Sequence, residues 1–421
     1  MTNISVLGEA LFQSPIRHYI DERLRLPRHI VQGGPVQEDD KLLFEMAGAR
    51  EKLFFDPAQT RVGIVTCGGL SPGLNDVIRS LFLELHYAYG VREVFGFRGG
   101  YGGLDPVQGK EPLRLTTDLV EGIQQEGGTI LGTSRGPVDI KRAVDNLMKR
   151  GVNILFTVGG DGTQRGGNEL YQEAKKRDYA LSVVGIPKTI DNDVAFVSRT
   201  FGYGTAVDEA SQVLDRAHTE ARSVENGISL VKLMGRQAGF IAAGATVASQ
   251  DVNFILIPEI PFKLDGPRGF LAALKDRVLD RAHAVIVVAE GAGQDLLSVS
   301  PDDRDASGNQ KFMDIGLFLR EKIGTYFKVE GIPFVLRYFD PSYLIRSSRA
   351  NAEDSILCDL FARNAVHAAM AGKTGLVIGY LHNQFIHVPI ELLTSRKKTL
   401  DPKGSAWTAA LAATGQQERF E

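Results

Sequence analysis

One rhythm repeats along this chain from Arg61 onward, and it restricts the folds that are open to the sequence. A short apolar run ends in a glycine-containing loop and a helical pattern follows, as in "RVGIVT", "CGGLSPG" and the stretch after them. In that stretch the apolar residues fall at offsets of 0, 3, 4, 7, 8 and 11 from Leu74, which is one face of an α-helix. Continuous apolar strands that alternate with helices favour a parallel sheet covered on both faces.

The number of repeats predicts two sheets. Further strand-like runs are "NILFTV", "LSVVGI", "ISLVKL", "NFILIPE", "AVIVVAEG", "GIPFVLRY" and "TGLVIGYL". We therefore expect an α/β protein with two doubly wound, Rossmann-like halves, mostly parallel sheets and a functional site in the cleft between them. The expected parts are an N-terminal extension (1–60), a first α/β domain (61–200), a second α/β domain (201–345) and C-terminal helices and strands that return to the body (346–421).

Charge and cysteine content exclude several classes of partner. The 48 Lys and Arg residues nearly balance the 51 Asp and Glu residues, so the charge favours neither nucleic acid nor an anionic membrane. No run of about 18 uninterrupted apolar residues is present, and the N-terminus lacks the basic region of a signal peptide. Two cysteines cannot form a disulfide framework. We expect a cytoplasmic protein.

A single carboxylate lies among the glycines of "VGGDGTQRGG" (158–167). Gly159, Gly160 and Gly162 let backbone N–H groups approach an anion closely, and the start of the following helix adds a favourable dipole. A carboxylate in such a phosphate cradle repels the phosphate unless a cation lies between them, and Mg²⁺ takes one or two carboxylates together with phosphate oxygens. Asp161 is therefore a candidate Mg²⁺ ligand, and the alternative is a plain Asp-Gly turn.

Two more acids follow the next apolar strand, in "PKTIDND" (187–193). Asp191 and Asp193 are two residues apart, so in an extended segment they face the same side, and Lys188 is close in sequence. Paired carboxylates at a strand end suit a general base that acts on a hydroxyl, whereas Asx turns are the structural alternative. A metal-binding acid and a basic carboxylate after consecutive strands indicate phosphoryl transfer.

Taken in order, the motifs of the chain resemble those of the 6-phosphofructokinase family from about Arg61 to about Gly375. They are "TCGGLSPGLN", "GGTILGTSRG", "GGDGTQRGG", "PKTIDND", "LMGRQAGF", "AEGAG" and "LRYFDPSYLIR". The resemblance implies a glycolytic kinase that phosphorylates fructose 6-phosphate at O1 with ATP and Mg²⁺. It also implies an allosteric homodimer or homotetramer.

The family's residue roles carry over to matching positions. The resemblance assigns the nucleotide side to Gly68, Arg135, Gly136, Gly160, Asp161, Gly162 and Thr163. It assigns the sugar-phosphate side to Thr189, Ile190, Asp191, Met234, Gly235, Arg236, Glu290, Arg337, Tyr343 and Arg346. Within these sets, Asp191 is the expected proton acceptor beside Thr189, Arg135 stabilises the transferring group, and Asp161 is the metal ligand.

Four positions bear on how the family pattern applies here. Tyr343 stands where short bacterial members have histidine, and Gly227 stands where they have an arginine that reaches a neighbouring subunit. Lys188 is usual in pyrophosphate-using members, but those members typically have aspartate at the position of Gly162. The Gly-plus-Lys combination resembles a longer, ATP-using branch. The alternatives are the same reaction with pyrophosphate as donor and a non-catalytic nucleotide or sugar-phosphate sensor.

Overall fold

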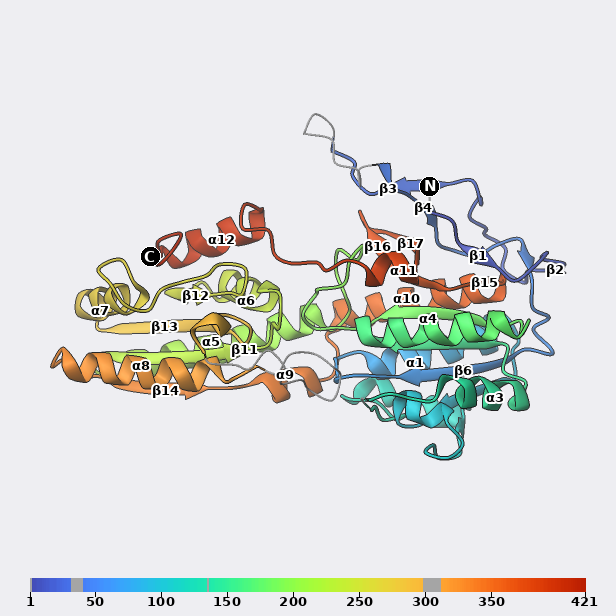
Figure 1. Cartoon of the computed structure of the whole chain (residues 1–421), viewed down its shortest axis with the longest axis horizontal. Coiled ribbons are helices and arrows are strands. Elements are labelled where there is room, and N and C mark those ends of the chain that lie inside the picture. Colours follow the sequence, from blue (N-terminus) through green and yellow to red (C-terminus); the bar gives the residue numbers. More distant parts are fainter. Residues whose placement is uncertain (1, 32–40, 135, 298–311) are drawn as a thin grey trace. The chain divides into compact units, whose positions relative to one another are not determined.

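The computed structural model of this chain describes residues 2–31, 41–134, 136–297 and 312–421. The chain forms two compact units and passes between them several times (Figure 1). Unit 1 consists of Met1–Thr189, Val194–Gly202 and Ser347–Lys397. Unit 2 consists of Ile190–Asp193, Tyr203–Arg346 and Lys398–Glu421.

The sheet of unit 1 has nine strands in the order β3-β4-β17-β16-β10-β9-β6-β7-β8. Its five central strands, from β16 to β7, run parallel to one another, and the outer strands pair antiparallel. The strand bounds are β3 Arg25–Pro27, β4 Leu43–Met46, β6 Arg61–Thr66, β7 Glu93–Phe97, β8 Leu113–Arg114, β9 Ile154–Gly159, β10 Ser182–Pro187, β16 Leu376–Leu381 and β17 Gln384–Pro389.

Alternation along the central strands explains why helices cover both faces of this sheet. Ile154 and Phe156 of β9 pack into one apolar cluster, whereas Leu155, which lies between them, packs into a second cluster on the other face of the sheet. Helices α1 (Leu74–Leu83) and α10 (Ala352–Met370) supply the first cluster. Helices α3 (Ile140–Arg150) and α4 (Asp161–Lys176) supply the second.

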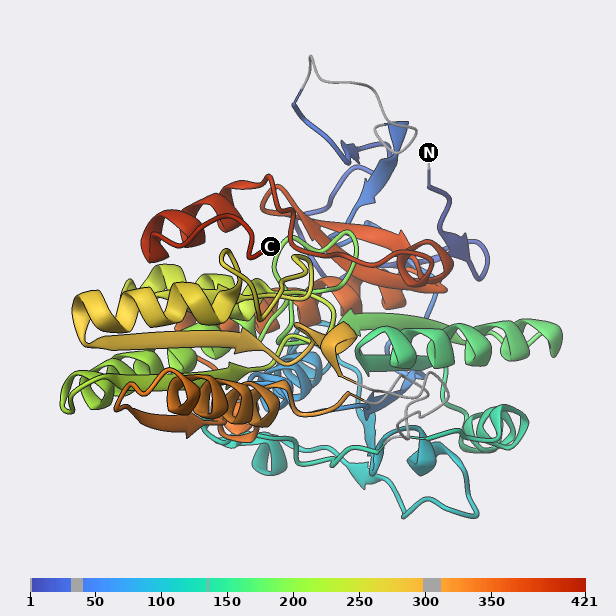
Figure 2. The same ribbon diagram turned by 60° about the vertical axis from the view of Figure 1, so that its left-hand side comes forward.

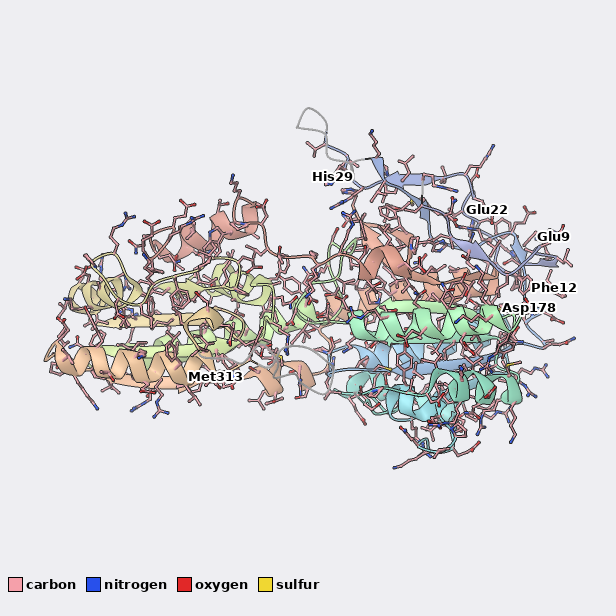
Figure 3. The ribbon with its side chains drawn as sticks, in the orientation of Figure 1. Glu9, Phe12, Glu22, His29, Asp178 and Met313 are labelled. Atoms are coloured by element: carbon pink, nitrogen blue, oxygen red, sulfur yellow. The ribbon has the colours of Figure 1, made fainter. Side chains whose placement is uncertain are left out.

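The N-terminal segment completes the edge of this sheet, since β4 pairs antiparallel with β17. Glu45 of β4 is buried, and its Oε1 accepts hydrogen bonds from Arg50 Nη2 at 2.9 Å, and lies 2.8 Å from Lys373 Nζ and 3.0 Å from His387 Nδ1. Glu22, labelled in Figure 3, lies 3.6 Å from Arg50 Nε. Buried ionic contacts therefore join the first fifty residues to the last strands of unit 1.

Unit 2 contains a four-stranded, fully parallel sheet in the order β12-β13-β11-β14. Alternate residues again reach two apolar clusters: Ile286 of β13 lies in one and Val287 in the other. Helix α12 lies against α6 in this unit (Figure 2). The bounds are β11 Gly227–Leu233, β12 Phe254–Leu256, β13 His283–Ala289, β14 Val335–Phe339, α5 Tyr203–Arg222, α6 Phe240–Ser249, α7 Phe270–Arg281, α8 Ile315–Val329, α9 Ser342–Ser347 and α12 Ser405–Thr414.

Short elements complete unit 1. They are β1 Ser5–Val6, β2 Phe12–Gln13, β5 Lys52–Leu53, β15 Lys373–Thr374, α2 Thr117–Val120 and α11 Ile390–Thr394. The expected α/β class with mostly parallel sheets is confirmed, and the structure adds strands such as β7 and β17 that the apolar runs did not predict. Within the described part of the chain, no helix has the length and apolar character that a membrane span requires.

Candidate active site

The strand order of unit 1 brings three glycine-containing or basic loops to one edge of its sheet. In chain order, β6 is the first of the five parallel strands. The next one, β7, lies on one side of it and β9 lies on the other side, so the strand order reverses between β6 and β9. Ligands of open α/β sheets bind outside the carboxyl ends of the strands at such a reversal. Thr66 is in register with Val158, and Pro187 with Gly159, so the loops that begin at Cys67, Gly160 and Lys188 leave the sheet at the same edge.

The loop after β9 becomes the first turn of α4 without an intervening linker. Gly160 is the extended N-cap residue of α4, and Asp161 is its first residue. Gly162 is exposed, and a Cβ added there would meet only Arg165 Nη2, at 3.9 Å. Thr163 is buried, and its carbonyl oxygen accepts a hydrogen bond from the Tyr101 hydroxyl at 2.5 Å. The helix start therefore offers backbone N–H groups and one carboxylate, which is a suitable place for a phosphate and its counter-ion.

Sequence reasoning did not predict the role of Gln164 in this turn. Its side-chain amide is buried and donates to the carbonyl oxygens of Gly159 at 2.9 Å and of Ile186 at 3.3 Å. These bonds tie the ends of β9 and β10 to the first turn of α4. In the sequence, only the place of this glutamine directly after "GGDGT" could have indicated such a role.

Lys188 lies against the first glycine loop. Its side chain is buried, and Nζ donates to the carbonyl oxygen of Gly69 at 2.5 Å. Gly68 has φ of 84°, and its carbonyl oxygen accepts a hydrogen bond from Thr133 Oγ1 at 2.6 Å. The structure therefore brings Gly68 and Lys188 together. Of the other residues predicted for the nucleotide side, Arg135 lies outside the described residues, and Gly136 is its neighbour in the chain.

The donors at this edge fit a magnesium ion that is bound together with phosphate oxygens. Among the described residues no group of three or more His, Cys, Asp or Glu side chains could hold a metal ion without other ligands. Asp161 supplies one carboxylate beside the N–H groups of the helix start. One carboxylate, phosphate oxygens and water form an ordinary Mg²⁺ coordination shell.

The segment that carries the predicted base bends at Ile190 and Asp191, so it does not have the extended conformation from which we expected its two acids to face the same side. Asn192, between Asp191 and Asp193, has φ of 55°, which is a left-handed conformation and not an extended one. Ile190 packs into the apolar core of unit 2, and the carbonyl oxygen of Asp193 accepts a hydrogen bond from Lys398 N at 3.2 Å. These two contacts, on either side of Asp191, fix the segment that carries it.

In the other sheet, the loops after β11 and β13 are bonded to each other. Glu290 N donates to the carbonyl oxygen of Leu233 at 2.9 Å, and Gly291 N donates to that of Gly235 at 3.2 Å. A Cβ at position 291 would lie 2.0 Å from the carbonyl oxygen of Arg236, so only glycine fits there. This close approach places Met234, Gly235 and Arg236 beside Glu290.

Charges of both signs gather around Glu290. Burial raises the pKa of Glu290, and the charges of Arg236, Lys232 and Arg346 act in the opposite direction, with a net shift upward. The Arg236 guanidinium stacks over the Phe312 ring at 4.7 Å, and that of Arg346 over the Tyr343 ring at 4.5 Å. Tyr343 is 69% exposed on α9. The group can bind an anion and accept hydrogen bonds from hydroxyls.

Arg337, which was predicted to belong to this group, does not join it, and Gly227 has a structural role. Arg337 lies inside β14 opposite Ser229, about 13 Å along β11 from its carboxyl end, and its Nε is 3.2 Å from Glu220 Oε1 on α5. Gly227 begins β11, and a Cβ there would lie 2.0 Å from the carbonyl oxygen of Ala221. This backbone therefore has no room for the arginine of short bacterial family members.

Comparisons with known proteins show what the chain is similar to. The family profile described as Phosphofructokinase matches residues 61–369. The chain is 45% identical to the ATP-dependent 6-phosphofructokinase of Borreliella burgdorferi over 98% of this chain and 96% of that protein. It is 48% identical to the ATP-dependent 6-phosphofructokinase of Trypanosoma brucei brucei over 87% of this chain and 75% of that protein.

A solved structure shares the fold at low sequence identity. It is a pyrophosphate-dependent phosphofructokinase from Marinobacter aquaeolei, which matches with a TM-score of 0.69 and 21% identity over 86% of this chain and 93% of that one. Because the profile matches most of the chain and the Borreliella burgdorferi protein is 45% identical along nearly its whole length, this chain belongs to the phosphofructokinase family.

Proposed function

We propose that the protein transfers the terminal phosphoryl group of ATP to O1 of fructose 6-phosphate, giving fructose 1,6-bisphosphate and ADP. The activity is that of an ATP-dependent 6-phosphofructokinase, and the relatives with that name support it. The observation that carries the assignment is the glycine-rich start of α4 with Asp161 at its first position, beside the loop of Gly68 and Lys188.

On the donor side, the first turn of α4 and the Gly68 loop hold the phosphates of ATP through backbone N–H groups. Asp161 would hold Mg²⁺ together with the phosphates, and the ion would supply neutralisation of charge on the phosphate oxygens. Lys188 adds a positive charge at the carbonyl edge of the Gly68 loop. Arg135, which lies outside the described residues, is assigned to the transferring group by resemblance to the family.

On the acceptor side, Asp191 takes the proton of the sugar 1-hydroxyl as its oxygen attacks phosphorus, and Thr189 orients that hydroxyl. The bond between the terminal phosphorus and the bridging oxygen breaks, and ADP leaves with the electron pair. Arg236 and Arg346 bind the 6-phosphate, and Glu290 accepts hydrogen bonds from sugar hydroxyls. Met234 and Gly235 line the sugar. Arg337, with its guanidinium on Glu220, is the least supported of the proposed 6-phosphate ligands.

ATP is the proposed donor in preference to pyrophosphate. The open, uncharged position at Gly162 leaves room for a nucleotide's α-phosphate beside the helix start. Lys188 attracts the terminal phosphate of either donor, so it does not distinguish them.

The proposal extends to assembly and location. Leu317 of α8 and Leu344 of α9 are large apolar residues that are exposed in this single chain, which supports a homodimer or homotetramer. Cys67 and Cys358 are both free and buried, which supports residence in the reducing cytoplasm. Light scattering of the purified protein tests the first part, because a monomer at assay concentrations would contradict it.

One experiment tests the activity and the donor together. Purified protein is assayed for fructose 1,6-bisphosphate with fructose 6-phosphate, Mg²⁺ and either saturating ATP or saturating pyrophosphate. We expect faster turnover with ATP and none after chelation of Mg²⁺. Faster turnover with pyrophosphate would overturn the donor assignment, and no turnover with either would overturn the function in favour of a sensor.

A further inference from the structure

A lysine of β11 joins two carboxylates at the carboxyl end of the sheet in unit 2. The side chain of Lys232 is only 12% exposed, and Nζ lies 2.6 Å from Asp314 Oδ2 and 2.8 Å from Asp340 Oδ2. Tyr338 OH donates to Asp314 Oδ1 at 3.1 Å. We propose that Lys232 is a positioning residue that holds helix α9, which carries Arg346, in the geometry that binds the sugar phosphate. This inference rests on the proposed function.

Each carboxylate that Lys232 contacts also fixes the start of a helix. Asp340 Oδ1 accepts hydrogen bonds from Ser342 Oγ at 2.6 Å and from Ser342 N at 3.3 Å, at the beginning of α9. Asp314 is the N-cap of α8, and its Oδ1 accepts a hydrogen bond from Leu317 N at 3.0 Å. One ammonium group therefore ties the end of β11 to the first turns of two helices.

Helix α9 is the element whose position this contact controls. It has six residues and carries Arg346, a proposed ligand of the 6-phosphate, together with Tyr343, whose ring lies under the Arg346 guanidinium. A helix this short gains little stability from its own hydrogen bonds, so its placement depends on tertiary contacts. They include the Asp340 link at the start of the helix and the packing of Ile345 in the apolar core of unit 2.

Lys232 also contributes to the charge balance of the site. Its charge and that of Asp340 both act on Glu290, together with Arg236 and Arg346. Burial lowers the pKa of Lys232, but its hydrogen bonds to Asp314 and Asp340 outweigh burial and raise the pKa above the ordinary lysine value. Removal of the ammonium group would leave two half-buried carboxylates near a site that must bind a phosphate dianion.

The test is Lys232→Met, which keeps most of the side-chain volume and removes the charge. We expect the KM for fructose 6-phosphate to rise at least about tenfold, while the KM for Mg-ATP stays within about twofold of the wild-type value. The dissociation constant of fructose 6-phosphate measured by calorimetry without ATP should rise by a similar factor. Lys232→Arg should restore most of the affinity, because it supplies a cation to both carboxylates.

A matched control exists in the same unit. Lys275 of α7 lies 3.2 Å from Glu330 Oε2, at the end of α8, and Lys275→Met should leave both KM values unchanged. If Lys232→Met does not fold, Asp340→Asn tests the same link, because the ammonium keeps Asp314 as its partner; we again expect weaker sugar-phosphate binding. An unchanged KM for fructose 6-phosphate in a folded variant would overturn the inference, as would equal losses for both substrates. Absence of fructose 6-phosphate turnover in the wild type would instead overturn the proposed function.

Discussion

Replacement of Gly162 by aspartate separates nucleotide binding from folding. Position 162 is exposed, and a Cβ there would meet only the end of the flexible Arg165 side chain at 3.9 Å. It is the second residue of α4, where the interaction of a carboxylate with the helix dipole stabilises the fold by about 0.3–1 kcal/mol. Repulsion from Asp161 offsets part of this gain. The free energy of unfolding should therefore change by less than about 1 kcal/mol.

The effect on ATP should be much larger than the effect on folding. Two unit charges about 4 Å apart interact with about 1 kcal/mol in water and about 4 kcal/mol at the effective dielectric constant of a protein surface. A carboxylate at position 162 would lie beside the proposed α-phosphate, partly shielded from solvent by the bound nucleotide. We expect the KM for Mg-ATP to rise between about fivefold and several hundredfold.

A coupled assay at saturating fructose 6-phosphate measures this change, with Mg-ATP and pyrophosphate titrated separately. Gly162→Asn is the matched control, because asparagine has the same volume without the charge and should cause a clearly smaller loss. Pyrophosphate use should be unaffected or increase in Gly162→Asp. Wild-type affinity of Gly162→Asp for Mg-ATP, or an equal loss of affinity in both variants, would refute the placement of the α-phosphate beside Gly162.

Three further predictions concern the base, the 6-phosphate and stability in acid. Asp191→Ser should lower kcat by about 10²–10⁴-fold with little change in either KM, and a variant with nearly normal kcat would exclude Asp191 as the base. Arg346→Ala should raise the KM for fructose 6-phosphate roughly 10- to 150-fold. A rise in the KM for ATP alone would show that α9 binds ATP and not the sugar phosphate. Burial lowers the pKa values of His367 and His387 to about 4, so the unfolded state, with its pKa near 6.5, binds more protons between pH 6.5 and pH 4. Stability should therefore fall as pH decreases through this window, by about 2 kcal/mol per histidine between pH 7 and pH 5 in urea titrations, and a constant free energy of unfolding would contradict the assignment.

The parts of the fold that were predictable from sequence are those with a strong local signal. The helix from Leu74 has one apolar face, and β9 is a continuous apolar run between turn residues, so each was recognisable without knowledge of its neighbours. Strand β17 carries polar residues and pairs with β4 from the N-terminal segment, a partner that no local pattern indicates. Long-range antiparallel pairing at a sheet edge therefore escaped prediction.

The same distinction applies to the site. Gly160 and Asp161 were predictable because a glycine-rich loop between a strand and a helix has a local physical purpose. Lys232 was not, because in "ISLVKL" it is one of two polar residues in a mostly apolar strand and its partners lie more than eighty residues away. The spacing of "LRYFDPSYLIR" matched Arg337 to a position in the family motif. It did not indicate that the Arg337 side chain pairs with Glu220 of α5.

The pairing of the first strands with the last ones has a consequence for biosynthesis. Glu45 and His387 are 342 residues apart in the chain. At ribosomal rates of about 5–20 residues per second, the N-terminal segment waits roughly 20–70 s before its partner strand is made. During this interval its carboxylate and strand edge face solvent or a chaperone. A C-terminally truncated chain that still contains the whole of β6, β9 and β10 would leave this edge without a partner, and we expect such chains to aggregate through it.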